Sequence, residues 1–120
     1  MNFLEKIFGK ADKRNPEELF QVTITDDFVT VEHPKAKTKT VKWTDIEEVR
    51  VINTDDDPDF TEVWIELVGK NDRCSIPQGA EGYNEVFEVV SGYDGFDAMN
   101  YIKVMGSADN EERVLWRRPQ

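Results

Sequence analysis

The sequence has only one cysteine and one histidine, which removes most catalytic and metal-binding possibilities. Cys74 cannot form a disulfide within the chain, and a single histidine, His33, cannot build a histidine-rich zinc site. A nucleophilic pair of Cys74 and His33 stays open, but a lone cysteine in an apolar strand is usually an inert small hydrophobic residue. We therefore expect a protein that is not an enzyme, with no catalytic residues, no bound metal and no cofactor.

Long apolar runs and glycine-rich phosphate loops are also missing. No stretch is long enough for a membrane span or for the apolar part of a signal peptide, which favours a cytoplasmic protein. The Gly-Ala-Glu-Gly segment at residues 79–82 has the wrong spacing for a phosphate loop. It also carries a carboxylate where phosphate would lie, so we expect no phosphate site there.

Acidic residues are abundant, and they are unevenly distributed. The chain has 25 Asp and Glu against 15 Lys and Arg, a net charge of −10, of which residues 1–42 contribute +1 and residues 43–120 contribute −11. Such a surface repels nucleic-acid phosphates and anionic lipid, so we expect neither nucleic acid nor membrane as a partner. A basic protein suits it best, although acidity also serves solubility alone. The oligomeric state is not indicated.

Alternation of apolar and polar residues predicts strands in the first two thirds of the chain. The pattern is clearest in residues 62–68, where odd-numbered residues are apolar and even-numbered ones include Glu62, Trp64 and Glu66. Several strands in sequence with short turns predict an antiparallel meander. Strands are predicted in residues 19–33, as a hairpin turning at 26–27, and in residues 38–43, 49–53, 62–68, around 74–76 and in 112–118.

From residue 77 the period changes to that of helices. Residues 83–90 place four apolar side chains on one face, while Glu81, Glu85 and Glu88 lie on the other. A second helix is expected to begin near residue 94 or 97 and to end at Gly106. Its apolar residues at 99, 102 and 105 repeat every three positions.

These patterns together predict an α+β fold. We expect residues 1–18 to form a short N-terminal helix and linker, and residues 19–120 to form one domain. The domain would be a curved antiparallel sheet of six to seven strands, with two C-terminal helices on one face and a returning last strand. Lysines at 35, 37, 39 and 42 would keep an edge strand from pairing with another chain. The predicted core includes Phe20, Val22, Ile24, Val41, Val63, Ile65, Leu67, Val86, Phe87, Ile102 and Trp116.

The acidic run between the strands of residues 49–53 and 62–68 is the main candidate site. Asp55, Asp57, Asp59 and Glu66 have the spacing of an EF-hand calcium loop. Phe60 stands where that loop needs glycine, and strands rather than helices flank it, so we predict no such metal site. Neighbouring carboxylates repel one another, and Arg or Lys from another chain would relieve that repulsion.

We therefore predict a surface that binds a basic protein. Trp64 shares a strand face with two glutamates and would suit contact with an arginine, unless the C-terminal helices cover it. The glutamates of the first helix would extend the negative field and speed encounter. The predicted partner-binding residues are Asp55, Asp56, Asp57, Asp59, Glu62, Trp64, Glu66, Glu85 and Glu88.

Short segments resemble two groups of bacterial proteins. The Trp-Thr-Asp-Ile-Glu-Glu-Val run at residues 43–49 resembles pleckstrin-homology-like and related small sheet domains. Residues 74–80, 95–97 and 115–116 look like a group of small acidic bacterial proteins of unassigned function. In size and acidity the chain is also similar to immunity proteins that neutralise basic nuclease toxins. These resemblances imply occlusion of a toxin's active site or, as the alternative, a pleckstrin-homology-like adaptor or structural module of the bacterial cytoplasm.

Overall fold

The computed structural model describes residues 20–34, 36–57, 60–107 and 110–119; for residues 55–57 and 60–62 it describes the backbone alone. The predicted N-terminal helix and linker, residues 1–18, lie outside the described residues. None of the described helices is long and apolar enough to cross a membrane. The elements are β1 (Gln21–Ile24), β2 (Phe28–His33), β3 (Ala36–Lys42), a 3-10 turn (Trp43–Asp45), β4 (Ile46–Asp57), β5 (Phe60–Gly69), β6 (Arg73–Pro77), α2 (Tyr83–Ser91), α3 (Ala98–Met105) and β7 (Glu111–Arg117).

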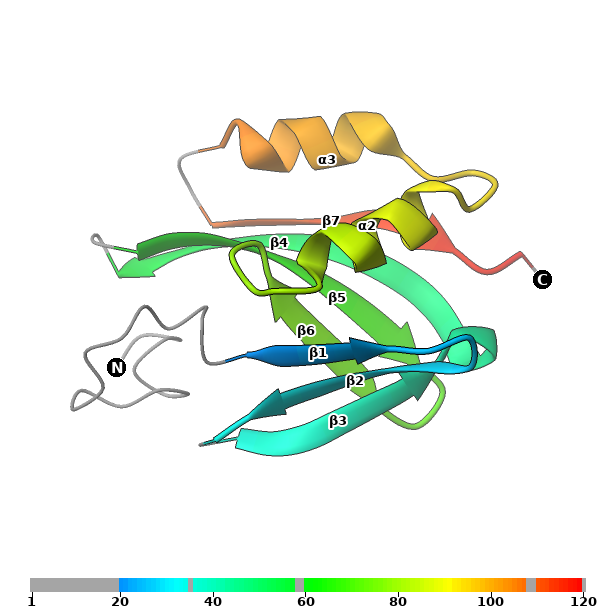
Figure 1. Cartoon of the computed structure of the whole chain (residues 1–120). Coiled ribbons are helices and arrows are strands. Elements are labelled where there is room, and N and C mark those ends of the chain that lie inside the picture. The colour runs from blue at the N-terminus through cyan, green and yellow to red at the C-terminus, as the bar shows by residue number, and fades with distance from the viewer. Residues whose placement is uncertain (1–19, 35, 58–59, 108–109, 120) are drawn as a thin grey trace.

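The described strands form two antiparallel sheets, with the orders β1-β2-β3 and β6-β5-β4-β7 (Figure 1). The predicted α+β class with C-terminal helices is confirmed, but the strands do not share one sheet. The 3-10 turn separates β3 from β4. Its Trp43 is fixed to the β1–β2 turn, since the backbone N–H donates to the carbonyl of Asp27 and the indole N–H to that of Thr25. The chain therefore changes direction and starts a second sheet.

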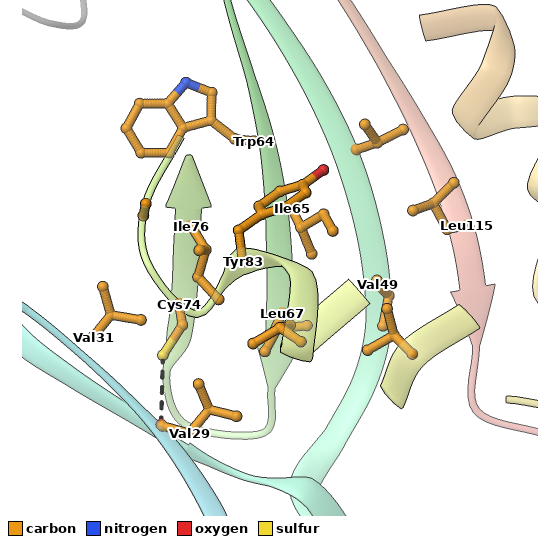
Figure 2. Packing of buried hydrophobic residues seen from close by; sticks show 14 of the residues in the cluster. Val29, Val31, Val49, Trp64, Ile65, Leu67, Cys74, Ile76, Tyr83 and Leu115 are labelled. Atoms are coloured by element: carbon orange, nitrogen blue, oxygen red, sulfur yellow. Dashed lines mark hydrogen bonds between the residues drawn. The ribbon is translucent and has the colours of Figure 1, made fainter. Parts of the chain in front are cut away.

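The core lies where the three-stranded sheet, the four-stranded sheet and α2 meet (Figure 2). The inward residues of β4 and β5, such as Val49, Val51 and Ile65, are fully buried. On β6 the thiol of Cys74 lies 4.0 Å from the carbonyl oxygen of Val29 on β2, so the two sheets are in direct contact. Burial of this kind contributes about 25 cal/mol per Å² of apolar area, so the contact between the sheets stabilises the fold.

The β4–β5 hairpin is longer than the sequence pattern suggests. The acidic run predicted as a loop, residues 54–59, belongs largely to β4, and Asp57 pairs with Phe60 across the ladder. A register shift between Thr54 and Asp57 marks an irregularity in that pairing. The backbone hydrogen bonds between β4 and β5 hold this acidic segment in a strand, although Asp and Asn have a low strand propensity.

Helix α3 faces the core with a different side from the one predicted. Ile102, expected in the core, has 59% of its surface exposed, while Val104 is fully buried. Tyr101 decides the orientation, because its hydroxyl lies 2.8 Å from that of Tyr83 and its ring packs on Phe87 of α2. Apolar residues occur on both sides of this helix, so periodicity alone gave the wrong face.

The last strand also turns a different residue inward. Leu115 is the buried residue of β7, and Trp116 is only partly buried, against the ring of Tyr93. Val49 pairs with Trp116 and Arg50 pairs with Val114, which leaves Leu115 as the extra residue of a bulge. Strict alternation along the strand cannot reveal such a shift. Of the other predicted core residues, Phe20, Val41, Val63, Ile65, Leu67 and Val86 are buried, and Val22, Ile24 and Phe87 are partly buried.

Candidate functional site

The acidic residues at the tip of the β4–β5 hairpin remain predictions. The side chains of Asp55, Asp56, Asp57 and Glu62, and the whole of Asp59, lie outside the described residues. The rest of the predicted surface can be followed side chain by side chain, on β5 and on α2.

Trp64 is not an exposed contact residue, so that prediction is wrong. Only 2% of its surface is accessible, and Phe20 covers it with an edge-to-face contact between rings whose centroids lie 5.5 Å apart. Phe20 directly precedes β1, so this cover comes from the N-terminal side of that strand. Both faces of the middle of β5 are therefore buried.

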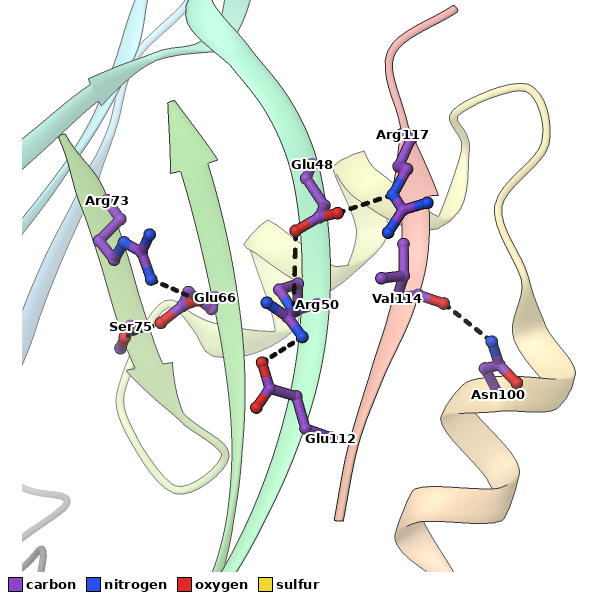
Figure 3. Close-up of polar contacts among 9 residues, drawn as sticks. All are labelled: Glu48, Arg50, Glu66, Arg73, Ser75, Asn100, Glu112, Val114 and Arg117. Carbon is purple, nitrogen blue, oxygen red and sulfur yellow. Dashed lines mark hydrogen bonds and ion pairs between the residues drawn. The ribbon is translucent and has the colours of Figure 1, made fainter. Parts of the chain in front are cut away.

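Glu66 is equally unavailable to a partner, which corrects a second predicted contact. It is 8% exposed, and its two carboxylate oxygens each lie 3.3 Å from a donor, Nη1 of Arg73 and Oγ of Ser75 (Figure 3). A buried carboxylate is retained only when it is hydrogen-bonded and paired in this way. Glu66 is thus part of the packing of the four-stranded sheet.

The same face of that sheet continues as a row of ion pairs (Figure 3). Glu48 accepts a hydrogen bond of 2.8 Å from Nε of Arg117, and Arg50 pairs with Glu112. On the opposite face of the sheet, where Arg113 pairs in register with Val51, Nη2 of Arg113 lies 2.8 Å from Glu111 and holds the pKa of that carboxyl below its usual range through a hydrogen bond. Glu48, Glu66 and Glu112 already have cations, so their face of the sheet presents little free negative charge.

The predicted carboxylates on α2 are arranged differently. Glu85 and Glu88 are exposed on the side of the helix that faces away from Tyr83, Val86 and Val90, as the sequence predicts. Glu81, just before the helix, is exposed as well. None of these three glutamates forms an ion pair with another residue in the described part of the chain. Their charge is therefore open to a partner.

Two of these carboxylates line a groove that the sequence does not reveal. The β1–α2 groove is formed by β1 and by residues 79–85, has a volume of about 610 Å³ and is lined by Glu81 and Glu85. It lies along an edge strand, since β1 pairs with β2 on one side and, among the described residues, makes only an isolated bridge from Gln21 to Glu81 on the other. An edge strand offers main-chain groups for pairing.

Gly82 brings the two walls of this groove together. Its φ of +99° is a left-handed conformation that other residues rarely adopt. A Cβ atom at this position would lie 2.8 Å from Cβ of Val22 on β1. Gly82 is the sequence feature that points to this close approach. An isolated glycine has no specific structural meaning until the helices and strands around it are known.

The nucleophile considered from the sequence is enclosed in the core. Cys74 has no accessible surface, and desolvation raises the pKa of its thiol to about 12. The thiolate is the reactive form of cysteine, and it is essentially absent at neutral pH with such a pKa. His33 is itself 6% exposed and packs against Phe20. These surroundings are those of structural residues.

The described residues thus separate two kinds of carboxylate. Glu48, Glu66 and Glu112 of the four-stranded sheet are paired with arginines, whereas those of α2 are exposed and lie beside an edge strand. Within the same residues no group of three or more His, Cys, Asp or Glu side chains is arranged to hold a metal ion. Comparison of the chain with protein-family models, with curated proteins and with solved structures finds no match.

Proposed function

We propose that this chain is a non-enzymatic binding protein that recognises a basic protein, most specifically an immunity protein that covers the active site of a basic nuclease-type toxin. The observation that carries the proposal is the set of exposed glutamates on α2 that form no ion pair with any described residue, in a chain with a net charge of −10. Charges of this kind accelerate encounter with an opposite surface and contribute less to the lifetime of the complex.

The contrast with the four-stranded sheet supports this choice of surface. Glu66 already accepts a hydrogen bond from Arg73, and Glu48 already accepts one from Arg117. A partner's arginine would have to displace those residues before it could bind there. On α2 it would meet Glu85 and Glu88 directly, and only hydration and screening oppose the contact.

The β1–α2 groove gives the contact a shape as well as a charge. An extended basic segment of a partner could follow the edge of β1, with Glu81 and Glu85 close to its side chains. Main-chain pairing would supply affinity, and the carboxylates would select lysine or arginine. In this proposal the toxin is inhibited by occlusion, because its basic active-site surface lies against α2.

The acidic tip of the β4–β5 hairpin is part of the proposal. Asp55, Asp56, Asp57, Asp59 and Glu62 would extend the contact by pairing with further cations of the toxin. We expect replacement of the first three aspartates by asparagine to weaken binding and to leave the melting temperature unchanged or raised, because repulsion among them is relieved. Unaltered affinity would remove the tip from the contact.

The test uses a purified basic nuclease domain, taken first from the gene next to the one for this chain. Inhibition of its nuclease activity at equal concentrations and the association rate constant are measured at ionic strengths of about 0.02 M and about 0.15 M. We expect inhibition, and an association rate at least tenfold slower at the higher salt. Indifference to salt would favour the alternative, an adaptor or structural module whose acidity only serves solubility.

A pair of matched variants separates the contact from the net charge. The double variant Glu85→Gln/Glu88→Gln should slow association about threefold or more at low salt. Glu47→Gln/Asp94→Asn removes the same charge from exposed positions outside the β1–α2 groove, and we expect it to have a smaller effect. Equal slowing by both doubles would mean that α2 is not the contact.

A further inference from the structure

A second concave site lies between the two sheets and shares one lining residue, Phe20, with the β1–α2 groove. This intersheet cleft has a volume of about 280 Å³ and is formed by residues of β2 and β3 on one side and of β5 and β6 on the other, with Phe20 at one end. Its floor is made of Phe20, Val31 and Trp64, which are buried apart from the surface they present here. Most of the exposed lining is apolar.

The rim of the cleft is basic. Lys37 and Lys39 contribute from β3 and Arg73 from β6, and among the described residues that line the cleft there is no carboxylate. The two lysines alternate with Thr38 and so share a strand face with Val41, which is 3% exposed. The lysines predicted to protect an edge strand thus line a space between the sheets.

Two of the three cations are held by carboxylates behind the rim. Nζ of Lys39 lies 3.3 Å from Asp72, and Nη1 of Arg73 lies 3.3 Å from Glu66. Lys37 forms no ion pair with any described residue and is exposed. The cleft thus has two cations paired with carboxylates and a third, Lys37, that is paired with no described residue, in a protein whose total charge is strongly negative.

We propose that the intersheet cleft binds a small organic anion with a flat apolar body, such as an aromatic carboxylate or sulfonate. Phe20, Val31 and Trp64 contribute apolar surface to the lining for such a body, and Lys37 and Lys39 offer donors for its charged group. The volume is close to the lower end of the range for ligand sites, so it fits a small molecule. This site is independent of the proposed binding of a basic protein.

The test uses the fluorescent anion 8-anilinonaphthalene-1-sulfonate and its uncharged relative N-phenyl-1-naphthylamine, each titrated into the full folded chain. We expect saturable binding of the anion. The double variant Lys37→Gln/Lys39→Gln should weaken it by roughly threefold to tenfold, as expected for exposed charged contacts. Affinity for the uncharged probe should change by less than about twofold in the same variant.

Lys42→Gln is the matched control, because Lys42 is an exposed residue of the same strand that points to the opposite face. It should leave both affinities unchanged. An equal loss in this control, equal losses for the two probes, or no saturable binding would each overturn the proposal. Anion binding that persists undiminished in the double variant would also overturn it, since the probe would then occupy another surface, such as exposed Met99 and Ile102 of α3.

A second measurement does not depend on lysine variants. The indole N–H resonance of Trp64, assigned with Trp64→Phe, should shift on addition of the anionic probe in two-dimensional NMR spectra. A Trp64 signal that does not respond while the probe binds would place the probe elsewhere and contradict the proposal.

Discussion

The guanidinium of Arg73 lies 3.3 Å from a carboxylate oxygen of Glu66 on the neighbouring strand, and the same arginine lines the intersheet cleft. One side chain therefore neutralises a buried carboxylate and supplies positive charge to a concave site. The pair explains why Glu66 does not act as an acidic contact. It also explains how a basic cleft exists in an acidic protein.

Removal of Arg73 should destabilise the fold more than removal of Arg117, since both arginines are mostly exposed but their carboxylate partners differ in burial. Arg73→Ala leaves Glu66, 8% exposed, without its cation, and we expect a loss of about 1 to 2 kcal/mol in the free energy of unfolding. Arg117→Ala should cost less than about 1 kcal/mol, because Glu48 is more exposed than Glu66 and keeps Arg50 at 3.7 Å. Urea denaturation measures both, and equal losses would contradict this reading of the pair.

Gly82 and Gly95 offer a matched test of the β1–α2 groove. Both have positive φ, +99° and +88°, but only at Gly82 would a Cβ meet a neighbour, Val22 at 2.8 Å. We expect Gly95→Ala to cost about 1 kcal/mol from backbone strain and Gly82→Ala to cost about 2 kcal/mol or more. Thermal denaturation provides the comparison. Similar losses of stability in the two variants would show that β1 moves away from residue 82 without a cost in free energy.

Asn53 connects β4 to the end of α3, and its loss should be expensive. Its side chain is 2% exposed and donates hydrogen bonds to the carbonyls of Val104, at 3.3 Å, and Ser107, at 2.8 Å. Asn53→Ala leaves both carbonyls without this donor, and we expect a loss of about 2 to 3 kcal/mol. Asn84→Ala, at an exposed position of α2, should be neutral or slightly stabilising in the same denaturation experiment.

Cys74 should make the stability of the protein depend on pH above about 9. Its pKa rises from an ordinary value of 9.0 to about 12 in the fold, mainly through desolvation. Between these values the folded protein keeps a proton that the unfolded chain has lost, so the free energy of unfolding falls as pH rises, by up to about 1.4 kcal/mol per pH unit.

The variant Cys74→Ala isolates this effect, because alanine does not titrate. Between about pH 8 and about pH 10.5 the parent should lose about 2 kcal/mol more than the variant, measured by urea denaturation at each pH. The variant starts from a lower stability because of the cavity it creates, so the difference in slope is the readout. Parallel slopes, or rapid labelling of the native thiol by a maleimide, would contradict the burial of Cys74.

Local sequence patterns were sufficient to predict the strands and helices and the exposed face of α2. The alternation in residues 62–68 placed Val63, Ile65 and Leu67 in the core, where they are, because a strand with a period of two has only two faces. The exposed Glu85 and Glu88 followed from the period of α2 in the same way. These predictions needed only neighbours along the chain.

Contacts between distant segments decided the rest. Trp64 is covered by Phe20, 44 positions earlier in the chain, and Glu66 is neutralised by Arg73 from another strand. No pattern within β5 distinguishes a face open to solvent from one covered by another segment. The predicted acidic contact surface therefore loses Trp64 and Glu66, and its other residues stay predictions.

The sequence by itself determined the α+β class, the order of strands and helices and the negative charge, because these depend on local periodicity and composition. Only the tertiary structure decided the division into two sheets, the face of α3 and the two concave sites. Side chains that lie far apart in the chain form those features, and the free energy of burying them together outweighs local preference. The cationic lining of the intersheet cleft is the clearest case, since the chain as a whole is acidic.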